Sequence, residues 1–156
     1  TSDSYYFGRA GKPILADDAR ALAPSEHGLF VIHSITPVVA TPDYIITVTN
    51  SGNSYVLSGS DRNGSFTSSS QPTLTFERGS IVQFNINSST SSAHPFYIKT
   101  SQSTGTGNQV ADVEGQGTTE LTWDTSTATP GANYGYQCSI HLSMWNTISI
   151  TPEVPV

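Results

Sequence analysis

The fold of this chain is decided by one segment, Tyr134-Gly135-Tyr136-Gln137-Cys138-Ser139-Ile140-His141-Leu142-Ser143-Met144. It holds the only cysteine and the only methionine among the 156 residues, and a histidine lies midway between them. Large or apolar residues alternate over 134–138 and again over 146–151, which predicts two strands. The histidine and the methionine therefore lie on a short loop between the last two strands, directly after the cysteine.

The same period-two alternation recurs upstream in short runs that are separated by turn residues. Strands are predicted over 29–36, 43–49, 55–57, 73–77, 81–87, 94–98 and 119–123. The Ser/Thr-rich stretches 64–71 and 88–92 are predicted as loops, and 101–117 shows no periodicity. No long helix is indicated. With about eight or nine short strands, the expected fold class is all-β, a Greek-key β-sandwich.

The composition narrows the possible partners. Only 12% of the residues are charged, and Val, Ile, Tyr, Phe and Thr carry the apolar runs, which favours strands over helices. The net charge of −6 and six scattered basic residues predict no nucleic-acid partner. No apolar run approaches the roughly 18 residues of a membrane span. The single cysteine excludes an internal disulfide, a Cys₄ zinc site and a two-cysteine binuclear copper centre.

The first residues differ from the rest of the chain. Residues 1–42 are interpreted as an N-terminal arm, with a short helix over 17–23 stopped by Pro24, or equally as the first strand and loop of the same domain. Residues 43–151 are the main domain, and 152–156 are a tail. The first residues do not have the pattern of a signal peptide, so an exported location is expected only if a leader has been removed.

Four residues form a candidate metal site. Cys138, His141 and Met144 follow one another at intervals of three, and His94 begins a predicted strand 44 residues before the cysteine. One thiolate, two imidazoles and a thioether are a soft ligand set, which suits copper with the methionine as a weak axial ligand. The alternative is a buried cysteine, a methionine that fills the core and two polar loop histidines.

Other possible sites are weaker. Residues 61–64 resemble part of a calcium loop but lack its other ligands, so a hairpin turn is the preferred interpretation. Asp112 and Glu114 could pair as catalytic carboxylates, but they lie in a Gly/Gln-rich stretch without the aromatic cluster of a sugar-binding site. Residues 26–27 with His33 are a second candidate metal site with fewer ligands. Neither a Ser/His/Asp arrangement nor a phosphate-binding glycine loop is present, and we expect no enzymatic activity.

The aromatic run 134–138, the Cys138-x-x-His141-x-x-Met144 spacing and the upstream His94 resemble the cupredoxins, the small blue copper proteins. The spacing is most similar to the short ligand loop of amicyanin, and the likeness covers about residues 43–151. The resemblance implies a Greek-key β-sandwich, one type 1 copper held by these four residues, and one-electron transfer with a redox partner protein.

Two positions depart from the family pattern. Pro95 follows the first ligand, where many cupredoxins have an asparagine that braces the cysteine loop. Because proline has no N–H, we expect one hydrogen bond to the thiolate to be missing, which would lower the reduction potential. Leu142 stands where proline is frequent, which changes the stiffness of the loop more than its ligands.

A second resemblance, over 53–63, 79–87 and 94–100, is to cupredoxin-like domains in structural proteins of marine bacteriophages. It implies a virion structural or decoration protein whose copper is structural or absent. Its partners would be neighbouring virion subunits, contacted through the N-terminal arm in a homo- or hetero-oligomer. The location would then be the virion, and otherwise periplasmic or extracellular.

Overall fold

The structure is a computed structural model that describes residues 5–7, 13–15 and 40–153. The chain divides into two compact units, 1–39 and 40–156. In the first, β1 (Tyr5–Phe7) pairs with β2 (Pro13–Leu15) as an antiparallel ladder. The predicted helix over 17–23, the predicted strand over 29–36 and the weak metal site at His27 and His33 lie outside the described residues.

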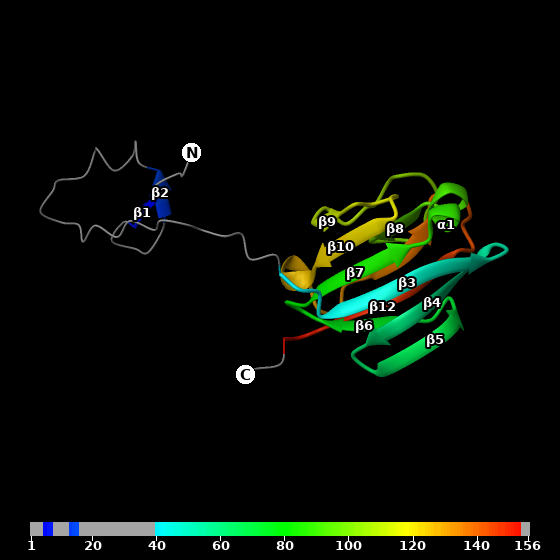
Figure 1. The fold of residues 1–156 in the computed structure, drawn as a ribbon, viewed down its shortest axis with the longest axis horizontal. Coiled ribbons are helices and arrows are strands. Elements are labelled where there is room, and N and C mark those ends of the chain that lie inside the picture. Colours follow the sequence, from blue (N-terminus) through cyan, green and yellow to red (C-terminus); the bar gives the residue numbers. More distant parts are fainter. Residues whose placement is uncertain (1–4, 8–12, 16–39, 154–156) are drawn as a thin grey trace, which may run out of the picture. The chain divides into compact units, whose positions relative to one another are not determined.

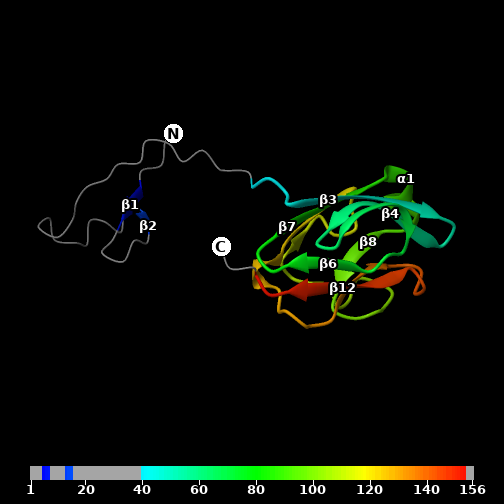
Figure 2. The same ribbon diagram turned by 90° about the horizontal axis from the view of Figure 1, so that it is seen from below.

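Residues 40–153 form a sandwich of two sheets (Figure 1). The first sheet has the order β5 (Gly64–Ser70), β4 (Ser54–Asp61), β3 (Tyr44–Ser51), β7 (Ile81–Ile86), β10 (Glu120–Asp124), β9 (Val113–Glu114). The second has the order β6 (Leu74–Glu77), β12 (Trp145–Thr151), β11 (Tyr134–Cys138), β8 (Phe96–Lys99). Figure 2 shows the two layers, with β3 and β4 above β6 and β12. The predicted all-β sandwich is confirmed.

The strand order explains how the last strands are held. β3 and β7 pair in parallel, as do β6 and β12, and the remaining ladders are antiparallel. β11 lies between β12 and β8, so the strand that ends at Cys138 is paired on both edges. All five residues of β11 are buried. The main chain at Cys138 is therefore held in place by the hydrogen bonds of two neighbouring strands.

The core lies between the two sheets and follows the predicted alternation. In β7 the residues Val82, Phe84 and Ile86 are buried while their neighbours are partly exposed. Tyr136 of β11 stacks on Phe96 of β8 with ring centroids 5.6 Å apart. Burial of such large side chains stabilises a fold by about 1.5–3 kcal/mol each. This aromatic layer supports the end of the sandwich that carries the predicted ligands.

Two predictions of local structure were wrong. Residues 64–70 form the edge strand β5, which a loop prediction missed because its ladder with β4 needs no apolar side chains at an exposed edge. Residues 88–93 form the short helix α1 (Ser88–Ala93), which Asn87 caps by accepting from the N–H of Ser89. The two-residue strand β9 lies in the stretch that lacks periodicity.

The segment 100–117 covers the free edge of β8. The amide of Gln116 pairs with the strand as another strand would: its Oε1 accepts from the N–H of Ile98 at 2.8 Å, and its Nε2 lies 3.3 Å from the Ile98 carbonyl. The N–H of Gly117 donates to the Phe96 carbonyl. The short 3₁₀ helix η3 (Thr125–Thr127) then leads towards β11. No helix among the described residues has the length and apolar character needed to cross a membrane.

Candidate metal centre

Three of the predicted ligands converge at one end of the sandwich. The Nδ1 atoms of His94 and His141 lie 3.1 Å apart. The Sγ atom of Cys138 lies 4.0 Å from Nδ1 of His94 and 3.7 Å from Nδ1 of His141. All three candidate ligand atoms lie within 4.8 Å of one another, and Met144 is close to them. The structure therefore brings together the four residues that the sequence singled out.

The triangle of ligand atoms has the size that a metal ion requires. Metal bonds of about 2.0–2.1 Å to nitrogen and about 2.3 Å to sulfur are typical of histidine and cysteine sites. With bond angles of about 100–130°, two nitrogens are then about 3.1–3.7 Å apart, and nitrogen and sulfur about 3.3–3.9 Å apart. The observed separations of 3.1, 3.7 and 4.0 Å match these values closely. One ion can contact all three atoms with little rearrangement.

The helix α1 positions His94. His94 is the C-terminal cap of α1, and its N–H donates to the Thr90 carbonyl at 2.7 Å. The hydroxyl of Thr90 donates to the side-chain carbonyl of Asn50, at the end of β3, at 2.8 Å. Because the residue before a proline disfavours the helical conformation, the helix ends at His94, which precedes Pro95. The imidazole is thus held by a helix that is anchored to the opposite sheet.

Tyr55 of β4 ties this segment to the cysteine loop. It is fully buried, and its hydroxyl lies 2.8 Å from the His94 carbonyl and 3.2 Å from the Pro95 carbonyl. The same Pro95 carbonyl accepts from the N–H of Ser139. Burial, and then the proximity of Cys138, raises the pKa of Tyr55 far above its usual value, so the phenol keeps its proton and donates.

The main chain of the loop after β11 is internally hydrogen-bonded. The N–H of Cys138 donates to the Met144 carbonyl at 3.0 Å, and the N–H of Met144 donates to the His141 carbonyl at 3.1 Å. The N–H of Ile140 points to Sγ of Cys138 at 3.4 Å. The sulfur therefore has one amide donor from its own loop, although Pro95 supplies none.

Gln137 holds the same loop from the other face of β11. Its side chain is fully buried, and its Nε2 lies 3.0 to 3.1 Å from the main-chain carbonyl oxygens of Cys138, His141 and Met144. Two N–H groups shared among several carbonyls fix a loop that would otherwise bury unsatisfied acceptors. The Oε1 atom has no hydrogen-bond partner among the described residues.

The donor atoms around the cluster suit a soft or borderline metal ion better than a hard one. The segments that meet at the cluster, 50–54, 88–95, 101–109 and 139–144, contain no aspartate or glutamate. Calcium and magnesium require several oxygen ligands, so they do not fit this donor set. Burial lowers the pKa of His94, and the neighbouring His141 lowers it further. That shift favours the neutral imidazole, which is the metal-binding form.

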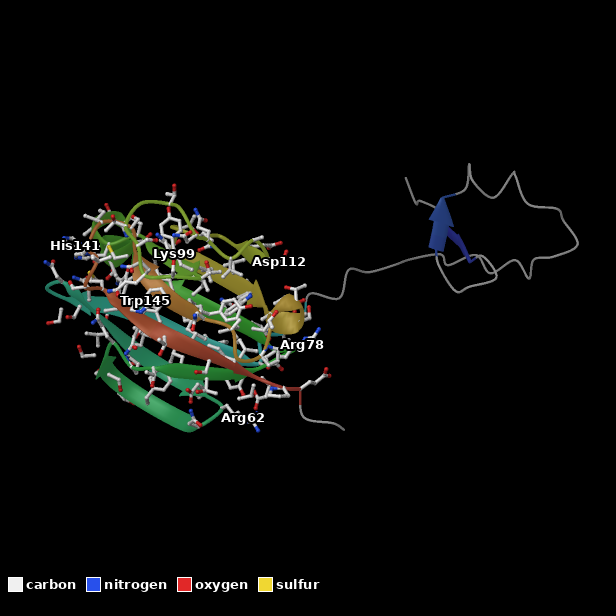
Figure 3. All side chains as sticks on the ribbon, turned by 180° about the vertical axis from the view of Figure 1, so that it is seen from behind. Arg62, Arg78, Lys99, Asp112, His141 and Trp145 are labelled. Atoms are coloured by element: carbon white, nitrogen blue, oxygen red, sulfur yellow. The ribbon has the colours of Figure 1, made fainter. Side chains whose placement is uncertain are left out.

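The ligands differ in their access to solvent. Cys138 and Met144 are fully buried and His94 is nearly so, whereas His141 is partly exposed. Figure 3 shows His141 at the end of the domain. On either side of it, Ile140 and Leu142 are among the few large apolar side chains that are exposed. The cluster therefore opens to the surface at one histidine.

The sequence did not indicate three of the supporting residues, Tyr55, Lys99 and Gln137. A tyrosine in a strand is usually core, and nothing in the sequence marks Gln137 apart from its place before the cysteine. Lys99 is fully buried in the structure, although lysine in an alternating strand predicts an exposed side chain. The roles of Lys99 and Gln137 depend on the loops that cover the outer face of β8 and β11. Tyr55 instead acts from inside the core, where it packs on Phe96 and Tyr136.

The weaker candidate sites have structural roles. The carboxylate of Asp61 accepts from the N–H groups of Asn63 and Thr75, each at 2.8 Å, which agrees with the preferred hairpin interpretation. Asp112 accepts from the hydroxyl of Thr127 at 2.7 Å. Within the described part of the chain, His94, Cys138 and His141 form the only group of potential metal ligands.

No family model matches this chain, and no curated protein matches it either. The likeness to the cupredoxins is therefore carried by the residues quoted above and by the geometry of the site. A β-rich sandwich with a His-Cys-His group near a methionine is compatible with that family. The metal centre is interpreted below from its own chemistry.

Proposed function

We propose that residues 43–151 are a mononuclear type 1 copper protein that transfers one electron at a time through His94, Cys138, His141 and Met144. The observation that supports this best is the triangle of two Nδ1 atoms and one Sγ atom, with a buried methionine close by. Two histidines, one cysteine and a weak axial methionine are the ligand set of blue copper sites. Bound copper would supply the change between Cu(I) and Cu(II).

The protein's contribution is to hold the ligands in one arrangement. α1 fixes His94, and Gln137 with the main-chain bonds of the loop fixes Cys138 and His141. A site that barely moves between two oxidation states loses little energy to reorganisation. Partly exposed His141 is the ligand through which an electron would reach a redox partner, because the other three are buried.

Zinc is the main competitor for this site. Two histidines and a cysteine also suit zinc, which prefers a tetrahedral environment. A buried thioether, however, is a ligand for soft ions such as Cu(I) and contributes little to zinc. The fully buried Met144 therefore favours copper.

The experiment is metal loading of the purified chain. Added Cu(II) should give an intense visible absorption from thiolate-to-copper charge transfer, which disappears when one electron per protein is added and returns on reoxidation. A Met144→Leu variant should retain the colour with a changed reduction potential, since the axial ligand tunes it. A chain that binds copper without a visible band, or that binds only zinc in competition, would refute the proposal.

The virion structural function remains a prediction from resemblance. Its partner contacts were expected from residues 1–42, most of which lie outside the described residues. No contact within 40–153 supports it over electron transfer.

A further inference from the structure

Lys99, the last residue of β8, has an unusual environment for a lysine. Its side chain is fully buried, and its ammonium donates to the carbonyls of Ser103 and Gly105, each at 2.7 Å. The ring of Tyr97 lies with its centroid 5.8 Å from Nζ. No carboxylate of the described residues is within salt-bridge distance of it. A buried charge without an acidic partner is costly, so main-chain carbonyls must compensate it.

The two carbonyls belong to the segment 101–107, which contacts the ligand loop at two points. The N–H of Gly105 donates to the Ser139 carbonyl at 2.7 Å. The side-chain amide of Gln102 donates to the Leu142 carbonyl at 2.8 Å. Ser139 follows Cys138, and Leu142 follows His141, so each contact is one residue away from a candidate ligand.

The segment 101–107 is otherwise held by hydrogen bonds from the residues that follow it. Asn108 donates to the Ser103 hydroxyl at 3.2 Å, and Gln109 donates to the Thr106 carbonyl at 2.6 Å. The residues of the segment are small and polar, and six of the seven are exposed, so apolar burial contributes almost nothing to its conformation. Lys99 supplies two charge-assisted bonds from a rigid strand, and such bonds are about twice as strong as neutral ones. In Figure 3, Lys99 lies on the same side of the domain as His141, away from Arg78.

We infer that Lys99 is a positioning residue of the metal centre, which acts through the carbonyls of Ser103 and Gly105 to hold segment 101–107 against the ligand loop. The identity of the metal rests on the proposed function, but the brace itself does not. Removal of the ammonium should free the segment, loosen Ser139 and Leu142, and so widen the distribution of ligand geometries.

The test compares Lys99→Leu with Phe76→Leu. Phe76 is a fully buried residue of β6 that contacts Tyr44 and Phe84, so its truncation lowers stability without touching segment 101–107. In metal-free protein, amide hydrogen exchange at Gly105 and the reaction rate of the Cys138 thiol with a thiol reagent should each rise about tenfold in Lys99→Leu and stay at the wild-type value in Phe76→Leu. This arm of the experiment needs no copper and tests the brace even if copper is not the ligand.

The second arm uses copper-loaded protein. Lys99→Leu should bind copper about tenfold more weakly, at the lower end of the usual effect of an outer-shell substitution, and should broaden the charge-transfer band. Phe76→Leu should change neither. Exposed Gln102 offers a variant that is expected to fold in any case, Gln102→Ala, for which a smaller shift in the same direction is expected. Equal exchange, thiol reactivity and spectra in wild type, Lys99→Leu and Gln102→Ala would overturn the inference.

Discussion

The two ends of the sandwich handle polar groups in opposite ways. At the end opposite the candidate metal centre, polar and charged side chains pair with one another: Tyr44 donates to Glu77 at 2.6 Å, and Glu77 lies 3.6 Å from Arg62. At the cluster end, buried polar side chains are neutral or donate to main-chain carbonyls. Figure 3 shows Arg78 and His141 at these two ends.

The polar contacts at the two ends therefore differ in their effect: those at the charged end stabilise the fold, and those at the cluster end hold the candidate ligands. The charged end contributes through ordinary exposed or half-buried pairs, which are typically worth about 0.2–1 kcal/mol each. The cluster end carries features that cost stability, namely a buried lysine and two imidazoles in contact. Such costs are expected where a site must be held ready for a ligand.

The strongest way to test this contrast is Cys138→Ser. Serine keeps the size of the side chain but removes the thiolate, the ligand with the largest effect on a soft metal. Copper affinity should fall by more than the 10–100-fold that is typical of outer-shell substitutions, and the visible band should vanish. Copper titration followed by absorption measures both effects. A variant that stays coloured would show that the sulfur is not a ligand.

Gln137→Leu should have the next largest effect. The substitution leaves several carbonyls of the ligand loop without a donor, which costs about 1–3 kcal/mol of stability. Copper affinity should fall by about 10–100-fold because the loop is no longer fixed from behind. Urea unfolding and copper competition against a chelator measure the two effects. Wild-type affinity in a destabilised variant would mean that Gln137 serves the fold alone.

Much of this arrangement could be predicted from the sequence, and the reason lies in its periodicity. β3, β7 and β11 alternate large apolar and polar or small residues, which predicts strands, and in β3 and β7 the buried positions follow that alternation. Cys138 and Met144 could be singled out because each is unique in the chain. Both the alternation of residues and the presence of a unique residue type can be recognised from the sequence alone.

The residues that support the site are not visible in this way. Lys99 looks like an exposed strand residue until segment 101–107 is seen to fold over it. The Ser/Thr-rich helix α1 has poor helix propensity, and it forms because Asn87 caps it and Asn50 receives the Thr90 hydroxyl. Long-range contacts that override local preference are the part that sequence reading misses.

At the charged end, Glu77→Gln should affect stability and leave the metal alone. It removes the charge from the bond to Tyr44 and from the pair with Arg62, at a cost of about 1 kcal/mol, since both groups are partly exposed. Burial, and then Glu77, raises the pKa of Tyr44 to about 12, so its contribution is present below pH 10 and is lost as the pH rises towards 12.

Unfolding at alkaline pH tests the Tyr44–Glu77 bond, and copper binding at pH 7 serves as the control. In Glu77→Gln, urea unfolding between pH 10 and 12 should show a smaller loss of stability than in wild type, because the Tyr44 pKa is less raised. Copper affinity should equal that of wild type at pH 7. A change in copper affinity would contradict the separation of the two ends.

The smallest expected effect is that of replacing Pro95, which should change only the reduction potential of the candidate metal centre. The sulfur of Cys138 has one amide donor, from Ile140 at 3.4 Å, because Pro95 has no N–H to offer. A second donor would stabilise the electron-rich thiolate of the reduced site. Pro95→Asn should therefore raise the reduction potential slightly, as measured by redox titration of the copper-loaded protein.

Pro95→Ala separates the two parts of that effect, since it restores the N–H without adding a side-chain amide. The Pro95 carbonyl, which accepts from Ser139 and lies 3.2 Å from the Tyr55 hydroxyl, is retained in both variants. A rise in both assigns the effect to the main-chain donor, and a rise in Pro95→Asn alone assigns it to the side chain. Unchanged or lowered potentials in both would show that the Ile140 amide already saturates the sulfur.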